Sequence, residues 1–288
     1  FKWDVNANLG LNKNKLNKLN SNLDFQLGPS IGFSQAYPIL FKVGQPLGIY
    51  WGAQTDGVYS DWEEAINSGI AGAAPGEIKY INNYVDLDES GNPLAIQEIN
   101  FDDYVKIGDP NPDFTYSISN NFSYKNWDAS FLFTGQKGGD LFWVDSWQLS
   151  GLQKSTNVLS SSFKNSWIAP LKYQNGTYLY DSTLGNINNV NHPGAMIDTG
   201  KRAISSDRNI YDGSFIRLKN INIGYNFDFS EGRNMRVYIS GQNLIVWTDY
   251  PGYDPEVRTY TKNPQKRGVD FGTYPGTKSI LIGLKFNY

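Results

Sequence analysis

Oxygen-bearing side chains that could hold a cation lie in the loop 86–92. Asp86, Asp88 and Ser90 have the alternate spacing of the first half of a calcium-binding loop, and a glycine stands at the sixth position, where such a loop turns. Gln97 occupies the twelfth position, where a calcium loop has a bidentate Glu. The segment therefore leaves two interpretations open, a weak calcium site and a solvated acidic turn.

Aromatic side chains form a second candidate site. Trp143, Asp145 and Trp147 lie in one short segment, and Tyr250 and Tyr253 lie in another that is rich in acidic residues. Aromatic rings stack on sugars and also pack against peptide side chains. This set therefore predicts substrate binding without choosing the ligand. The alternative is that the rings pack the loops or line a membrane interface.

The sequence shows no arrangement for catalysis. His192 is the single histidine, and no Ser or Asp lies at a spacing that would make it a general base. There is no phosphate-binding loop and no dinucleotide-binding fingerprint. We predict that the chain is not an enzyme and has no cofactor, apart from the calcium alternative at 86–92.

The composition indicates an all-β fold. The 288 residues are 40% hydrophobic and 15% aromatic, with 29 Gly and no Cys, and aromatic residues favour strands over helices. The net charge of −3 gives no basic field, so nucleic acid is excluded as a partner. The absence of Cys excludes disulfides and thiolate zinc sites.

Alternation of apolar and polar residues predicts long strands. In residues 114–124 Phe, Tyr and Ile share one face, and Ser and Thr line most of the other. The same period predicts strands over 1–12, 127–136, 215–227, 236–247 and 279–288, and a less regular strand over 38–55. Lys125 and Asn126 form a tight turn, and a change of parity near Asn243 predicts a bulge.

Two architectures fit these strands, a transmembrane barrel and a secreted β-sandwich. The strands are about as long as a tilted membrane-crossing strand, and their polar faces hold Asn, Ser, Thr and Gln, as a water-filled lumen requires. After the first connection, the predicted connections alternate between long and short, which is typical of outer-membrane barrels. We therefore predict an antiparallel β-barrel that crosses the outer membrane in contact with its lipid, with long extracellular loops.

The predicted strands are too few to close a barrel. About seven strands would form an open sheet, and its two edges would leave unpaired backbone groups in lipid at several kcal/mol each. We interpret residues 1–288 as the C-terminal portion of a larger barrel, with the earlier strands outside this chain. This scheme puts the connection 13–37 on the side of the short turns, which leaves its length without a physical account.

Six blocks of sequence strengthen the barrel interpretation. They are QPLGIYWG (45–52) with DGVY (56–59), PGEIKY (75–80), IGDPNPDF (107–114), DGSFIRLKN (212–220), SGQNL (240–244) with WTDY (247–250) and GYDPE (252–256), and GTYP (272–275). In order and spacing they resemble the SusC/RagA family of TonB-dependent outer-membrane transporters of Bacteroidetes. The sequence departs from that family over 86–106, where the family often has a DxNGDG loop.

The resemblance implies a complete machine of which this chain is a part. It implies an outer-membrane barrel of about 22 strands, with a plug and a TonB box that lie outside this chain and couple it to the TonB complex. It also implies a SusD-like lipoprotein on the extracellular face, a dimer of SusC–SusD pairs, and import of oligosaccharides or oligopeptides. The runner-up function is that of a secreted β-sandwich that binds or cleaves glycans.

Overall fold

The computed structural model describes residues 1–31, 37–150, 157–181, 184–185, 192–194, 204–229, 232–257 and 263–287. Tyr288, the last residue of the predicted strand 279–288, lies outside the described residues. Within those ranges, no helix has both the length and the apolar character needed to cross a bilayer.

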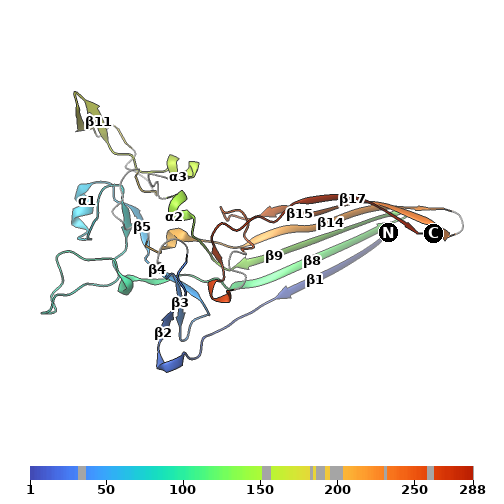
Figure 1. The fold of residues 1–288 in the computed structure, drawn as a ribbon, viewed down its shortest axis with the longest axis horizontal. Coiled ribbons are helices and arrows are strands. Elements are labelled where there is room, and N and C mark those ends of the chain that lie inside the picture. The colour runs from blue at the N-terminus through green and yellow to red at the C-terminus, as the bar shows by residue number, and fades with distance from the viewer. Residues whose placement is uncertain are drawn as a thin grey trace.

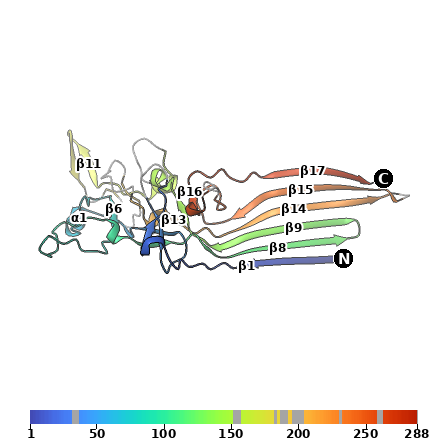
Figure 2. The same ribbon diagram turned by 60° about the horizontal axis from the view of Figure 1, so that its bottom comes forward.

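A six-stranded antiparallel sheet forms one half of the molecule (Figure 1). In spatial order its strands are β1 (Lys2–Gly10), β8 (Pro112–Tyr124), β9 (Trp127–Gly138), β14 (Phe215–Asp228), β15 (Asn234–Trp247) and β17 (Ser279–Asn287). Figure 2 shows them side by side, with both chain ends at the end of the sheet away from the loop region. The all-β prediction is confirmed, and six of the seven predicted strands form this sheet.

The prediction of a seventh long strand over 38–55 was wrong. It consists of two short strands in a four-stranded sheet of the loop region, β2 (Phe25–Leu27), β3 (Ile39–Lys42), β4 (Ile49–Gly52) and β7 (Val105–Gly108). Gly44 and Gly48 have φ values of 87° and 75°, so the chain turns back between β3 and β4 instead of crossing the membrane. The placement of 13–37 on the short-turn side was therefore wrong, because residues 11–111 form a single connection between neighbouring strands β1 and β8.

The connections sort by length to the two ends of the sheet. The turns 125–126 and 229–233 lie at the end that holds the chain termini, and the connections 11–111, 139–214 and 248–278 lie at the other (Figures 1 and 2). This is the distribution of short periplasmic turns and long extracellular loops found in outer-membrane barrels.

The strand register gathers the apolar side chains on one face. One rung of the sheet runs through Leu9, Tyr116, Gly135, Ile216 and Trp247 on five successive strands. No second sheet covers this face within the described residues, and its side chains stay open, for example Trp3 at 57% and Ile282 at 75% exposure. The sandwich alternative is wrong, because a sandwich buries its apolar faces against each other.

The opposite face of the sheet is polar and carries a charged pair. Arg236 on β15 contacts both carboxylate oxygens of Asp128 on β9, with Nε 3.0 Å from Oδ1, and also donates to the Asn222 side-chain oxygen on β14. A charged pair is costly against lipid and acceptable in a wet lumen. The two faces therefore have the chemistry of a barrel wall.

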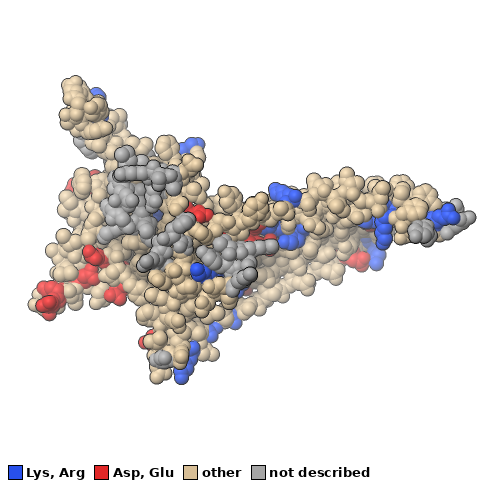
Figure 3. Space-filling model, viewed as in Figure 1, with Lys and Arg blue, Asp and Glu red and all other residues tan. Residues whose placement is uncertain are grey.

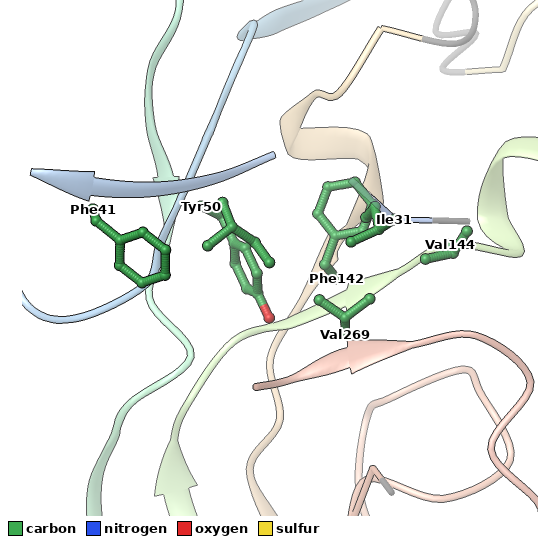
Figure 4. Close-up of a cluster of buried hydrophobic side chains, with 7 residues drawn as sticks. Ile31, Phe41, Tyr50, Phe142, Val144 and Val269 are labelled. Atoms are coloured by element: carbon green, nitrogen blue, oxygen red, sulfur yellow. The ribbon is translucent and has the colours of Figure 1, made fainter. Parts of the chain in front are cut away.

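The three long connections fold into one loop region. Its remaining elements are η1 (Asn20–Asn22), β5 (Thr55–Val58), α1 (Trp62–Asn67), β6 (Ile78–Tyr80), η2 (Phe101–Asp103), β10 (Leu141–Trp143), α2 (Ser146–Leu149), α3 (Ser160–Lys164), β11 (Leu171–Gln174), β12 (Thr177–Tyr180), η4 (Asp207–Asn209), β13 (Ile210–Tyr211), η6 (Pro264–Lys266) and β16 (Val269–Asp270). Tyr50, Phe142 and Val269 come from three different connections and are fully buried against one another (Figure 4). The hydroxyl of Tyr50 donates to the backbone oxygen of Arg267 at 2.9 Å, so the cluster also satisfies its one polar group.

Candidate functional site

Two of the predicted substrate-binding aromatics lie together at the base of the loop region. The rings of Trp143, Tyr211 and Tyr250 meet edge to face, with centroid distances of 5.6, 6.2 and 6.1 Å. Trp143 is 5% and Tyr250 4% exposed. The cluster joins β10, β13 and the connection after β15. Sequence reasoning missed Tyr211, whose signal is its position directly before the DGSFIRLKN block.

The hydroxyl of Tyr250 is committed to a buried carboxylate. It donates to Oδ2 of Asp270 at 2.5 Å, while Oδ1 of Asp270 accepts the backbone N–H of Thr273 at 2.8 Å. Burial, together with the hydrogen bond to Asp270, raises the pKa of Tyr250 far above its ordinary range. The hydroxyl therefore remains protonated and acts as a fixed donor that joins two parts of the connection 248–278.

The other three predicted residues differ in accessibility. Asp145 is half-buried, and burial, followed by the negative charge of Asp270, raises the pKa of its carboxyl. Trp147 packs edge to face on Phe142 at 5.4 Å, and its buried indole N–H has no hydrogen-bond partner among the described residues. Tyr253 is 75% exposed. Of the five predicted residues, Tyr253 is thus the most open to a ligand in solution.

The loop 86–92 is closed by its own hydrogen bonds. Oδ1 of Asp88 accepts the backbone N–H groups of Ser90 and Asn92, both at 2.8 Å, and the hydrogen bond from Asn92 heads the causes that lower the pKa of Asp88. One oxygen of Asp86 accepts the backbone N–H of Glu98 at 2.9 Å. Acidic side chains gather on this side of the loop region (Figure 3).

The acidic side chains of the described part of the chain do not gather into a metal site. No group of three or more His, Cys, Asp or Glu side chains there has a geometry that could hold a metal ion. The calcium site at Asp86, Asp88 and Ser90 stays a prediction.

The single histidine, His192, is partly buried next to an arginine. Nδ1 of His192 is 3.4 Å from a guanidinium nitrogen of Arg208. Burial, followed by the Arg208 charge, lowers the pKa of His192, so the ring is neutral at pH 7. Its backbone oxygen accepts the N–H of Trp167 at 3.0 Å, which gives this residue a place in loop packing.

A buried ion pair that sequence reasoning missed joins the sheet to the loops. Arg217 on β14 contacts Asp254 at 2.5 Å through Nη2 and Glu256 at 2.9 Å through Nε. The side chains of Arg217 and Asp254 are 4% and 9% exposed. An Arg within an otherwise alternating strand, with two carboxylates in the GYDPE block, was the available signal.

Comparisons with known proteins agree with this architecture. No family model matches the sequence. Over its whole length the chain is 32% identical to TonB-dependent receptor P3 of Formosa agariphila and 24% identical to TonB-dependent receptor SusC of Bacteroides thetaiotaomicron. It spans only 27% and 24% of those proteins.

The structure also matches a solved transporter. The superposition on one chain in the structure of the RagAB peptide transporter covers 99% of this chain and 27% of that chain, with a TM-score of 0.66 and 18% sequence identity. That likeness shows the fold. Together with the sequence matches it confirms the resemblance to TonB-dependent receptors of the SusC/RagA type, and the six-stranded sheet is part of a β-barrel of the outer membrane.

Proposed function

We propose that the protein containing this chain imports oligosaccharides or oligopeptides across the outer membrane. The observation that carries the proposal is the division of the chain into a wall with one apolar and one polar face and a folded loop region at one end of that wall. A water-filled passage needs such a wall, and cargo selection at its entrance needs ordered loops.

We further propose that a SusD-like lipoprotein covers the loop region and that the TonB complex supplies the energy through segments outside these 288 residues. The similarity to a protein named SusC and to the RagAB peptide transporter supports this. A dimer of SusC–SusD pairs would be the complete assembly.

Within the loop region, the accessible aromatic Tyr253 is the best-placed cargo contact. Trp147 and Asp145 lie partly open and could complete a contact surface, whereas Trp143 and Tyr250 are buried and hold the loops from beneath. A stacking platform suits either cargo class, because both sugars and peptide side chains present flat apolar faces. Substitution of Tyr253 therefore tests whether this surface contacts the cargo.

The test is uptake by cells that carry the full-length protein or lack its gene. Labelled oligosaccharides and labelled oligopeptides are offered separately, with and without an uncoupler of the proton gradient. We expect uptake of one class to require both the gene and the gradient. If cells that lack the gene took up both classes as fast as cells that carry it, the proposed import function would be contradicted.

A second exposed tyrosine on the same connection, 248–278, provides a matched control. Tyr274 is 85% exposed, so Tyr274→Ala removes an equally open ring. We expect Tyr253→Ala to reduce cargo uptake and Tyr274→Ala to leave it near the wild-type rate. Equal uptake by the two variants would remove Tyr253 from the proposed contact surface.

A further inference from the structure

A polar pocket lies between two of the long connections of the loop region. One wall belongs to the connection 11–111 and the other to the connection 248–278, and the volume is about 440 Å³. Sites for small molecules in proteins have volumes of about 300–1,000 Å³. None of the described residues that line this pocket belongs to the six-stranded sheet. The pocket is therefore a feature of the loops and not of the wall that meets the lipid.

The charged side chains that line this pocket are all positive. They are Lys266 and Arg267, and no Asp or Glu is among the described residues of the lining. Arg267 is exposed, and its guanidinium has no hydrogen bond or ion pair with a residue in the described part of the chain. Asp109, which accepts a hydrogen bond from the lining residue Asn111, is already paired with Lys106 at 3.0 Å. The lining therefore has an unbalanced positive charge, which favours an anionic ligand.

The backbone that carries Arg267 is fixed by the buried cluster of the loop region. Its own backbone oxygen accepts the hydroxyl of Tyr50 at 2.9 Å, and the backbone oxygen of Gly268 accepts the N–H of Phe142 at 3.0 Å. Gly268 has a φ of 71°, and a Cβ there would lie 2.5 Å from the Tyr50 hydroxyl oxygen, so this position requires glycine. The guanidinium is therefore presented from an ordered backbone, which lowers the entropy cost of binding.

The uncharged polar side chains that line the pocket are all amides. Asn14 is committed to the fold, since it donates to Oδ1 of Asn111 at 3.1 Å and accepts the backbone N–H of Leu47 at 2.7 Å. Asn12 and Gln265 are exposed, and their side chains have no hydrogen-bond partner among the described residues. A free amide both donates and accepts, as a sugar hydroxyl does. The lining thus matches a molecule that has many hydroxyls and a negative charge.

We propose that this pocket binds an acidic sugar of an oligosaccharide cargo. The carboxylate or sulfate of the sugar lies against Arg267 and Lys266. Its hydroxyls lie against Asn12 and Gln265. A guanidinium donates two parallel hydrogen bonds to such an oxyanion. A peptide cargo in extended form would pair its backbone with a strand edge, whereas most of the lining lies outside strands. This cargo class rests on the proposed import function and narrows it to acidic oligosaccharides.

Binding to the purified full-length protein tests the pocket. The probes are oligogalacturonides and chondroitin sulfate oligosaccharides, each beside a neutral counterpart of equal length made by carboxyl reduction and desulfation. Acidic oligopeptides form a third arm. We expect calorimetric titration to show at least one acidic oligosaccharide bound about tenfold more tightly than its neutral counterpart, with an affinity that falls as salt rises. Equal affinities within both pairs, or tighter binding of the peptides, would overturn the proposal.

A charge variant locates the acidic group of the ligand. Arg267→Gln should weaken binding of the acidic probe about tenfold and leave binding of its neutral counterpart unchanged. Lys278→Gln is the matched control, because Lys278 is an exposed cation on the same connection and lies outside the pocket. Equal affinities of the two variants for the acidic probe would overturn the assignment of the acid to Arg267.

A filling variant locates the sugar itself. Leu47 lines the pocket and is 52% exposed, so Leu47→Trp should narrow the pocket and weaken binding of the acidic probe about tenfold. Leu94→Trp is its control, because Leu94 is 44% exposed on the same connection and outside the lining. Heat-modifiable migration in gels confirms that each variant has a folded barrel. Wild-type affinity in Leu47→Trp would overturn the site.

Uptake by cells separates this proposal from the import function on which it rests. The same probe pairs are offered to cells that carry the full-length protein, with and without an uncoupler of the proton gradient. Gradient-dependent uptake of neutral oligosaccharides or of peptides, without preference for the acidic probes, would overturn the acidic cargo and leave import in place. Uptake that needs neither the gene nor the gradient would contradict import itself, and the titrations would still decide whether the pocket binds an acidic sugar.

Discussion

The guanidinium of Arg217 lies 2.5 Å from Oδ1 of Asp254, and this buried pair joins the polar face of β14 to the connection that follows β15. The same carboxylate group also accepts the backbone N–H groups of Glu256 and Gly276, at 2.9 and 3.2 Å. Asp254 therefore organises its own connection and attaches it to the wall.

Arg217→Met should destabilise the full-length protein by about 3–5 kcal/mol, because it leaves the Asp254 carboxylate buried without its cation. Lys137→Met is the control. Its ion pair with Asp212 is about half exposed, so its loss should cost about 0–1 kcal/mol. Denaturant unfolding in detergent measures both. Similar costs for the two variants would show that the Arg217 pair does not hold the loop.

Arginine substitutions on adjacent residues of β8 report which face meets the lipid. Ile118→Arg places a charge on the apolar face and should cost roughly 2–4 kcal/mol near the membrane midplane. Ser119→Arg places the same charge on the polar face and should be far milder. Unfolding free energies of the full-length protein in lipid provide the measurement. Equal losses of stability in the two variants would contradict the assignment of faces, and a larger loss in Ser119→Arg would reverse it.

Two aromatic substitutions separate loop packing from cargo contact. Trp143→Ala removes a buried ring and should cost about 3–5 kcal/mol. Tyr253→Ala removes an exposed ring and should change stability by no more than about 0.5 kcal/mol, while cargo affinity falls. Thermal unfolding and cargo titration of the same samples distinguish them. If Trp143→Ala left the stability unchanged and weakened cargo binding, Trp143 would be a cargo contact and not a packing residue.

Acid should loosen the segment around Glu64. The backbone N–H of Ser60 and then the Lys79 ammonium, which lies 2.9 Å from Glu64, hold the pKa of this carboxyl below its ordinary 4.5. A carboxyl whose pKa is lowered by folding contributes its full stabilisation at pH values above the ordinary pKa. This stabilisation is lost as the pH falls through the pKa of the folded state. The protection of the backbone N–H of Ser60 against hydrogen exchange, measured relative to the intrinsic rate at each pH, should therefore fall below pH 4.5. In Glu64→Gln this acid dependence should be absent, and its persistence would point to another group.

Strand positions could be predicted from the sequence where local alternation decides them. The faces of β8 and β9 and the turn at Lys125 and Asn126 are confirmed, because each follows from neighbours along the chain. The bulge is also confirmed. Asn243 has a φ of 50°, and the pairing of β15 with β14 shifts there by one residue.

The loop region could not be predicted in this way. The segment 38–55 alternates enough to indicate one long strand, but only the positive φ of Gly44 and Gly48 shows that the chain turns back. The contacts of Trp143 with Tyr211 and Tyr250 join residues far apart in sequence, so no local pattern specifies them. Arg217 lies in a strand that alternation predicts, but no local pattern identifies Asp254, 37 residues away, as its partner.

Gly10 and Thr115 are paired across β1 and β8, so the segment between them, which contains the whole connection 11–111, begins and ends at two points about 5 Å apart. The entropy of closing such a loop grows only with the logarithm of its length, by about 0.6 kcal/mol for each doubling. The hairpin therefore tolerates the gain or loss of long stretches without a change in strand register. Under the proposed import function, the sequence of this connection can therefore change with the cargo while the membrane-crossing strands keep their geometry.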